Sequence, residues 1–314
     1  MASSPANSQA TNDDPAGPLS SAHHDTVTIT PYNAEARLAC SDVDWVLETS
    51  QADESGVEER AQASRHISIS SRQFQDEEVG RLLAQIQTGH LSSSSPSSSG
   101  QHDPTPVANL AKYTHTGCYF VDLSCSPTYK FRGWTAGRRN NKSRNDLILC
   151  LENSALHGIR QHHAAFQVHK IGRILVRKIS DRGVVEVNGE ALGSREFRLF
   201  NKHSSFIRLG QLKYQVTYTR HSATEEYNEA MSQYICTSDG IQRPVDLSMT
   251  PTPAPGNDIQ VGRWTLTSAG TVGIGGSGRV SVGVGNTGEV VALKRMSVAS
   301  TTAPNNTTTL LKRR

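Results

Sequence analysis

Short strand-like segments follow one another from residue 136 to residue 218 and restrict the fold more than any other feature of the chain. Each is rich in apolar residues, and Gly, Asn, Asp or Ser separates it from the next. The six segments are 147–151, 164–169, 173–179, 184–187, 206–209 and 213–219. Many short strands divided by turn residues are typical of a β-sandwich whose loops gather at its ends. The sequence therefore predicts a mainly β fold.

The composition indicates that part of the 314 residues does not fold. Hydrophobic residues make up 35% of the chain, which is low for a fully globular protein. Residues 1–108 are rich in Ser, Ala, Gln, Asp and Pro, and 92–100 is a low-complexity serine run. Because such segments bury too little apolar surface to offset their ordering entropy, we expect residues 1–108 to be disordered. The exception is one short helix, since Val79, Leu82, Leu83 and Ile86 have helical spacing.

The rest of the chain divides into five parts. We expect the sandwich over 109–220, a helix over 221–237, a proline-rich linker over 238–258, a second folded segment over 259–296 and a tail over 297–314. The S-x-x-E pattern from Ser222 to Glu225 predicts the start of the helix, and Gly240 marks its end. A linker with four prolines is extended, so it should hold two modules apart.

Cysteines and histidines indicate structural roles rather than a metal site. The five cysteines contain no C-x-x-C pair, and the histidines at 157, 162, 163 and 169 have no cluster of cysteines or carboxylates near them. We therefore expect no bound metal. The sequence has neither a secretory signal nor an apolar run of the ~20 residues that span a bilayer. An intracellular protein that does not bind membranes is the expectation.

A glycine-rich segment near the C-terminus has the spacing of a phosphate-binding loop. Residues 273–280 read G-I-G-G-S-G-R-V, which fits G-x-G-x-x-G-x-V, and residues 289–294 read E-V-V-A-L-K. Glycine suits such a loop because backbone N–H groups approach phosphate oxygens closely when no Cβ intervenes. The two segments predict a β-hairpin whose second strand ends on a lysine.

This hairpin resembles the start of a eukaryotic serine/threonine protein kinase domain. The resemblance implies six ATP-facing positions: Gly273, Gly275, Gly278, Val280, Ala292 and Lys294. The 314 residues contain neither H-R-D nor D-F-G, so no catalytic residue is assigned. ATP is implied as a cofactor only if the kinase domain is complete, and we expect this partial lobe to be inactive alone.

Taken together with that hairpin, the sandwich resembles a forkhead-associated domain. The resemblance lies, in order, in Gly137-Arg138, N-D-L-I-L at 145–149, H-A-A-F at 163–166, V-N-G at 187–189 and L-G at 209–210. In that family, loops at one end of the sandwich bind a phosphothreonine peptide. The order of such a domain followed by a kinase is similar to fungal and animal checkpoint kinases. It implies a nuclear signalling role of the DNA-damage checkpoint type, with a phosphorylated protein as partner.

The resemblance places the phosphopeptide site at a basic loop end. The residues implied are Arg138, Arg139, Lys142, Arg160, His163 and Asn188. The chain departs from the family pattern at Arg160 and Gln161, where the family has serine and arginine, and at Gly183, where it has asparagine. Arg160 either gives the phosphate a second guanidinium or fills the threonine pocket with its bulk. The second alternative would leave a protein-binding scaffold that does not depend on phosphate.

Two other classes compete with peptide recognition. Nucleic-acid binding is disfavoured because the formal charge is only +3 and few aromatic residues lie near the basic loop at 138–144. An active kinase stays open as an alternative, because a chain that continued past Arg314 with the missing motifs would transfer the γ-phosphate of ATP. In that case Lys294 would be the phosphate lysine.

Overall fold

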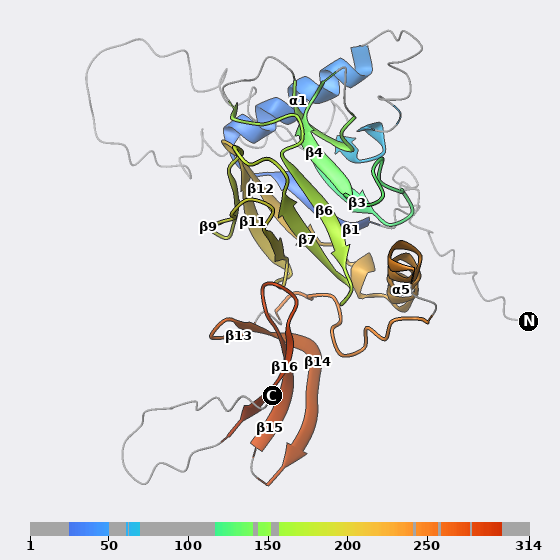
Figure 1. Cartoon of the computed structure of the whole chain (residues 1–314), viewed down its shortest axis with the longest axis vertical. Helices are drawn as coiled ribbons and strands as arrows, with labels where there is room; N and C mark the ends of the chain where they lie inside the picture. Colours follow the sequence, from blue (N-terminus) through green and yellow to red (C-terminus); the bar gives the residue numbers. More distant parts are fainter. Residues whose placement is uncertain are drawn as a thin grey trace, which may run out of the picture.

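The computed structural model describes residues 25–49, 61, 63–69, 117–140, 144–151, 157–240, 243–256, 259–276 and 278–296. Over these residues the protein is mainly β, with three sheets of seven, five and four strands. The seven- and five-stranded sheets form a sandwich, and the four-stranded sheet lies beyond one end of it (Figure 1). None of the helices described is both long and apolar enough to cross a membrane.

The sandwich joins strands from distant parts of the sequence. The order in the larger sheet is β2 (Ile67–Ile69), β3 (Gly117–Asp122), β1 (Asp25–Pro31), β12 (Leu212–Tyr218), β11 (Ser204–Leu209), β8 (Val185–Val187) and β9 (Glu190–Ala191). The order in the smaller sheet is β10 (Phe197–Leu199), β7 (Arg173–Lys178), β6 (Ala164–His169), β4 (Trp134–Arg138) and β5 (Leu147–Cys150). Among the described strands only β4 and β5 pair in parallel. The six segments expected from the sequence correspond to β5, β6, β7, β8, β11 and β12.

The core lies between the two sheets and is closed by aromatic side chains. Trp134, Phe166 and Tyr214 are each at most 1% exposed. The strand β12 shows why the sequence pattern works, because its alternate residues from Leu212 to Tyr218 are buried while the residues between them are not. The Tyr218 hydroxyl donates to the carbonyl oxygen of Phe200 at 3.0 Å, which satisfies a polar group inside the core.

The expectation that residues 1–108 are disordered is wrong for the part that the structure describes. β1 lies in the middle of the larger sheet, paired on one side with β12 and on the other with β3. Its residues 26–30 read T-V-T-I-T, and Val27 and Ile29 are buried in the core. A strand in this position is part of the sandwich, so the folded unit begins well before residue 109. The helix expected around Val79 lies outside the described residues.

A helix also precedes residue 109. α1 (Ala34–Thr49) contacts β5 of one sheet and β1, β3 and β12 of the other, and it lies across the end of the sandwich in Figure 1. Val43 and Leu47 pack on Ile148 of β5. The Asn33 side chain caps the helix, because its Oδ1 accepts from the N–H of Ala36 at 3.2 Å and from that of Lys213 at 2.9 Å. These contacts bind the start of α1 to the start of β12.

The helix after the sandwich is α5 (Glu225–Asp239). Its N-cap is Thr224, whose side chain accepts from the N–H of Tyr227 at 3.2 Å, and not Ser222 as the S-x-x-E pattern predicts. Ser222 instead donates its hydroxyl to the carbonyl oxygen of Thr219, in a short 3₁₀ turn. The predicted end is confirmed, because Gly240 adopts the left-handed conformation at φ 66°.

The proline-rich segment after α5 does not hold two modules apart. Thr250 and Thr252 are buried, and the Thr250 hydroxyl donates to the carbonyl oxygen of Ile171 at 3.0 Å. The fully buried Arg173 donates from Nη2 to the carbonyl oxygen of Pro251 at 3.0 Å. Because the sandwich satisfies the polar groups of this segment, residues 243–252 pack along its surface.

The third sheet contains the predicted hairpin and two further strands. Its order is β13 (Gln260–Val261), β14 (Trp264–Gly275), β15 (Gly278–Val284) and β16 (Val290–Arg295). Its turn at 285–288 reaches the sandwich, where Asn201 Nδ2 donates to the carbonyl oxygen of Gly285 at 2.9 Å. The N–H of Leu199 donates to the carbonyl oxygen of Asn286 at 3.0 Å. The sheet is therefore docked on the sandwich at the end opposite α1 (Figure 1).

Candidate functional site

Two arginines lie on adjoining backbones at the α1 end of the sandwich. Arg138 is the last residue of β4, and its N–H donates to the carbonyl oxygen of Arg160 at 3.1 Å. The preceding residue has to be glycine, because a Cβ at Gly137 would collide with the carbonyl oxygen of Gln161. The glycine before Arg138 thus lets the chain at residues 160–161 lie directly on β4.

His163 stabilises this arrangement from the interior of the sandwich. It is fully buried, its Nδ1 accepts from the N–H of Arg160 at 3.1 Å, and its Nε2 lies 2.8 Å from the carbonyl oxygen of Val184. These partners assign the ring proton to Nε2. Burial is the largest influence on its pKa and lowers it, so the ring is neutral at pH 7. His163 therefore positions two loops, and its burial keeps it from contacting a ligand itself.

Glycine is also required on the loop facing this histidine. A Cβ at Gly183 would lie 2.7 Å from Cε1 of the His163 ring. The N–H of Gly210, in the turn between β11 and β12, donates to the carbonyl oxygen of Val184 at 2.9 Å. The loops at 157–163 and 179–184 and the turn at 210–211 thus converge on one small area of backbone.

Asn145 and Asp146 stabilise the same loop end through hydrogen bonds that the sequence pattern did not predict. Asn145 is buried, and its Nδ2 donates to the carbonyl oxygens of Arg138 at 3.0 Å and Gln161 at 2.7 Å. The fully buried Asp146 accepts from the backbone N–H of Thr128 and from that of Thr135, each at 2.8 Å. The available signal was a polar pair placed directly before the wholly apolar strand 147–150.

The basic side chains at this end differ in exposure. Arg160 and Arg182 are exposed, while Arg138 and Arg139 are partly buried. The side chain of Arg160 is therefore accessible to solvent. Asp181, a carboxylate in the 179–184 loop, accepts a hydrogen bond from the Ser194 hydroxyl. Guanidinium groups on convergent loops are chemically suited to an anion such as a phosphate ester.

Two residues predicted for this site are not placed in it. Asn188 lies in the turn after β8, where its Oδ1 accepts from the N–H of Phe206 at 2.9 Å. Because β8 runs from Val185 to Val187 away from the loop that contains Val184, it places Asn188 about 10 Å from that loop end. Asn188 is therefore a turn residue with φ 51°, and its assignment to the phosphopeptide site is corrected. Lys142 lies outside the described residues.

The glycines expected to face ATP differ in whether their surroundings require glycine. A Cβ at Gly273 or Gly275 would meet nothing within 4 Å, so packing does not explain these two glycines. Gly278, by contrast, has φ 131°, and a Cβ there would collide with the carbonyl oxygen of Arg295. The hairpin closes where Gly275 pairs with Gly278.

The remaining positions that the resemblance expects to face ATP lie on one face of the third sheet. Val280 pairs with Lys294 and Val282 with Ala292 in antiparallel register. Directly opposed residues and residues two apart share a face of a sheet, so Val280, Ala292 and Lys294 lie on the same side. The register therefore places these three side chains on one face of the sheet.

The fold and the basic loop end define a class: a mainly β protein with a basic loop end on a sandwich and a glycine-rich hairpin in the third sheet. No model of a known protein family matches the sequence, and the search of curated proteins finds no match either. Over the described ranges, no group of three or more His, Cys, Asp and Glu residues is arranged to hold a metal ion.

Proposed function

We propose that the sandwich binds a phosphothreonine-containing segment of a partner protein, in the manner of a forkhead-associated domain. The observation that carries this proposal is the 3.1 Å backbone hydrogen bond between Arg138 and Arg160 at the loop end. In this proposal the guanidinium groups of the two arginines supply N–H donors for a phosphate that carries nearly two negative charges.

The loop end is also preorganised for such a ligand. His163 and Asn145 hold the loops by hydrogen bonds of 2.7–3.1 Å, and both are buried. Binding then orders little additional backbone, which reduces its entropic cost. The exposed Arg160 favours phosphate-dependent binding over a scaffold that ignores phosphate. A nuclear role in checkpoint signalling belongs to the same proposal and is supported by the resemblance alone.

A phosphothreonine peptide library with randomised flanking residues tests this proposal. The peptide that the immobilised protein enriches most is labelled, and its affinity is measured by fluorescence anisotropy. Hydrogen bonds to charged groups contribute about 1.5–3 kcal/mol, so Arg138→Ala is expected to weaken binding by roughly 10- to 150-fold. We expect Arg160→Ala to weaken it as well.

The matched control is Arg220→Ala, which removes the same charge from an exposed position that follows β12 at the opposite end of the sandwich. It should leave the affinity unchanged. Equal retention of the phosphorylated and unphosphorylated libraries would contradict the proposal. An affinity that falls steeply with salt on duplex DNA, but not on the peptide, would favour nucleic acid instead.

For the third sheet, we propose a similarity to the first strands of a kinase lobe that binds ATP. It is supported by Val280, Ala292 and Lys294 on one face and by the open space around Gly273 and Gly275. Catalysis is not proposed for these 314 residues, since they lack H-R-D and D-F-G. Coding sequence downstream of Arg314 that contains both motifs would support a longer, active kinase.

A further inference from the structure

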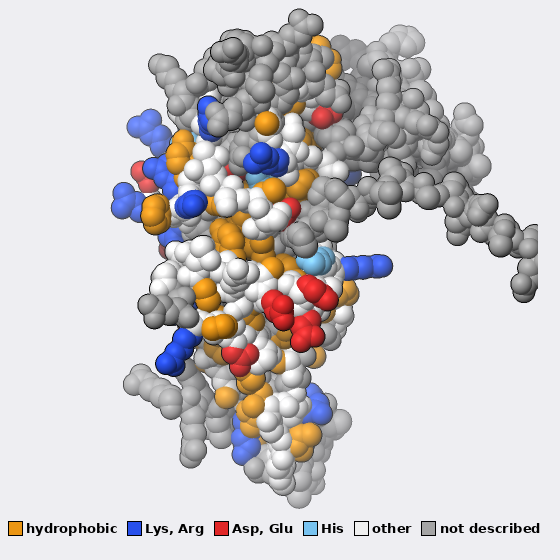
Figure 2. All heavy atoms as spheres, turned by 90° about the vertical axis from the view of Figure 1, so that its right-hand side faces the viewer, with side chains coloured by type: hydrophobic (Ala, Val, Ile, Leu, Met, Phe, Trp, Pro, Cys, Tyr) orange, Lys and Arg blue, Asp and Glu red, His pale blue; other side chains and the backbone are white. Residues whose placement is uncertain are grey.

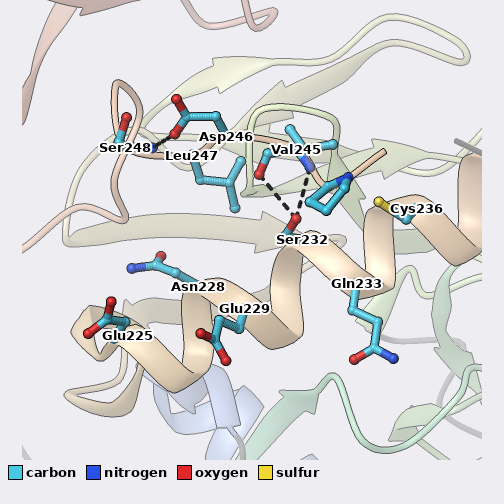
Figure 3. A pocket seen from close by; sticks show the side chains of 11 residues that line it. Glu225, Asn228, Glu229, Ser232, Gln233, Cys236, Val245, Asp246, Leu247 and Ser248 are labelled. Carbon is cyan, nitrogen blue, oxygen red and sulfur yellow. Dashed lines mark hydrogen bonds between the residues drawn. The ribbon is translucent and has the colours of Figure 1, made fainter. Parts of the chain in front are cut away.

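A groove runs along α5 on the side of the molecule away from the basic loop end. One wall is α5, and the other is the segment 244–248 that follows it (Figure 3). The cavity between them has a volume of about 600 Å³. We call it the α5 groove, and its lining includes Glu225, Asn228, Glu229, Val245, Asp246 and Leu247.

α5, which forms the first wall of the groove, is rigid because its opposite face is buried in the core. Tyr227, Met231 and Ile235 follow at intervals of four residues, and each is at most 2% exposed. Both ends of α5 are capped, by Thr224 and by Gly240. The outward face of α5 is therefore presented to solvent in a fixed position.

The second wall is fixed by polar and apolar contacts. The Ser232 hydroxyl donates to the carbonyl oxygen of Val245 at 3.1 Å and accepts from its N–H at 2.9 Å, as the dashed lines in Figure 3 show. Leu247 is buried against Gly172, where a Cβ would lie 2.9 Å from its Cδ1. Because both walls are held in place, a ligand orders little of this protein when it binds.

Charge is unevenly distributed around the α5 groove. Residues 221–256 contain five carboxylates and one arginine, although the whole chain has a formal charge of +3. Acidic side chains gather on the face that carries α5 in Figure 2. The backbone N–H of Ser248 donates to Oδ1 of Asp246 at 2.9 Å and lowers the pKa of this carboxyl below its ordinary value, and the group is ionised at neutral pH. Glu225 and Glu229 are one helical turn apart on the same side of α5.

We propose that the α5 groove docks a basic peptide segment of a partner protein. An apolar side chain of the peptide enters between α5 and Val245, next to Leu247. Its Lys or Arg residues lie against Glu225, Glu229 and Asp246, so charge complementarity selects the partner. This docking site is independent of phosphopeptide binding at the other end of the sandwich.

Fluorescence anisotropy with the labelled peptide Leu-Lys-Arg-Leu-Lys-Arg tests the proposal on the full chain. Asn228→Trp fills the groove and is expected to weaken binding at least tenfold. Glu229→Gln removes one rim charge and is expected to weaken it about two- to fivefold, as for a solvent-exposed ion pair. Circular dichroism and thermal unfolding of each variant confirm that α5 is intact.

The matched control is Glu226→Gln, which removes a carboxylate from the same helical turn outside the groove lining. Its affinity should equal that of the unmodified chain. Equal weakening by Glu226→Gln and Glu229→Gln would reveal a non-specific attraction and overturn the proposal. So would full affinity in Asn228→Trp, or no binding at about 1 mM peptide. A severalfold gain on removing residues 297–314 would assign the groove to the chain's own tail rather than to a partner.

Arg138→Ala separates this site from the proposed function. It should weaken binding of the phosphothreonine peptide by roughly 10- to 150-fold and leave binding of the basic peptide unchanged. If neither peptide binds the unmodified chain, both proposals fail independently.

Discussion

Ile29→Ala tests the most unexpected part of the fold, the strand β1 in the middle of the larger sheet. Ile29 is 1% exposed and pairs with Val216 on one side and with Tyr119 on the other. Removing a buried isoleucine side chain costs about 2–5 kcal/mol, because transfer free energy is lost and a cavity remains. We take about 3 kcal/mol, since neighbouring strands on both sides limit collapse of the cavity.

Urea unfolding followed by circular dichroism measures this loss. With a denaturant slope of about 2.5 kcal/mol per molar, 3 kcal/mol lowers the midpoint by roughly 1.2 M. Thr30→Ala is the matched control, because the next residue of the same strand is exposed and should shift the midpoint by about 0.2 M or less. Equal midpoints for the two variants would refute the placement of β1 in the sheet.

Two further predictions concern buried titratable groups. Burial lowers the pKa of His163 below its ordinary value of about 6.5. As the pH falls through 6.5, His163 therefore binds a proton in the unfolded chain but not in the folded chain, and this lowers the stability of the folded chain. The urea midpoint should therefore fall as the pH is lowered from 7.5 to 5, and it should fall less in His163→Asn. A decline of the same size in His163→Asn would contradict the role given to His163. Burial raises the pKa of Cys150 to about 12, so iodoacetamide at pH 8 should modify this thiol only after unfolding. Mass spectrometry measures the modification of each thiol. If Cys150 in the folded chain reacted as fast as the half-buried Cys236, β5 would be open to the reagent and the prediction would be wrong.

The strands that could be predicted are those with a local signal. β6 and β12 were anticipated to within one residue, because apolar residues and turn residues alone identify them. β4 was not anticipated, since its Trp-Thr-Ala-Gly-Arg sequence is short and four of its five residues are buried. A strand buried on both faces shows no alternation, so periodicity does not mark it.

The candidate site was predictable only where its residues carry a local signal in the sequence. Arg138 and Arg160 were identified from motif positions, and the structure places their backbones in contact. Asn188 was assigned to the same site from a motif, yet β8 directs it to the far end. Motif order along the chain does not state at which end of a strand a loop lies.

The amino-acid sequence by itself determined the mainly β character, the end of α5 at Gly240 and the hairpin of β15 and β16, although β16 ends at Arg295 and not at the predicted Lys294. Each depends on interactions among residues close in the chain, which act before distant segments meet. Tertiary structure alone decided that β1 completes the sandwich, since Val27 pairs with Tyr218. A seven-residue strand such as β1 gains its hydrogen bonds and buries its side chains only against partners distant in the sequence, and composition carries no record of such pairing.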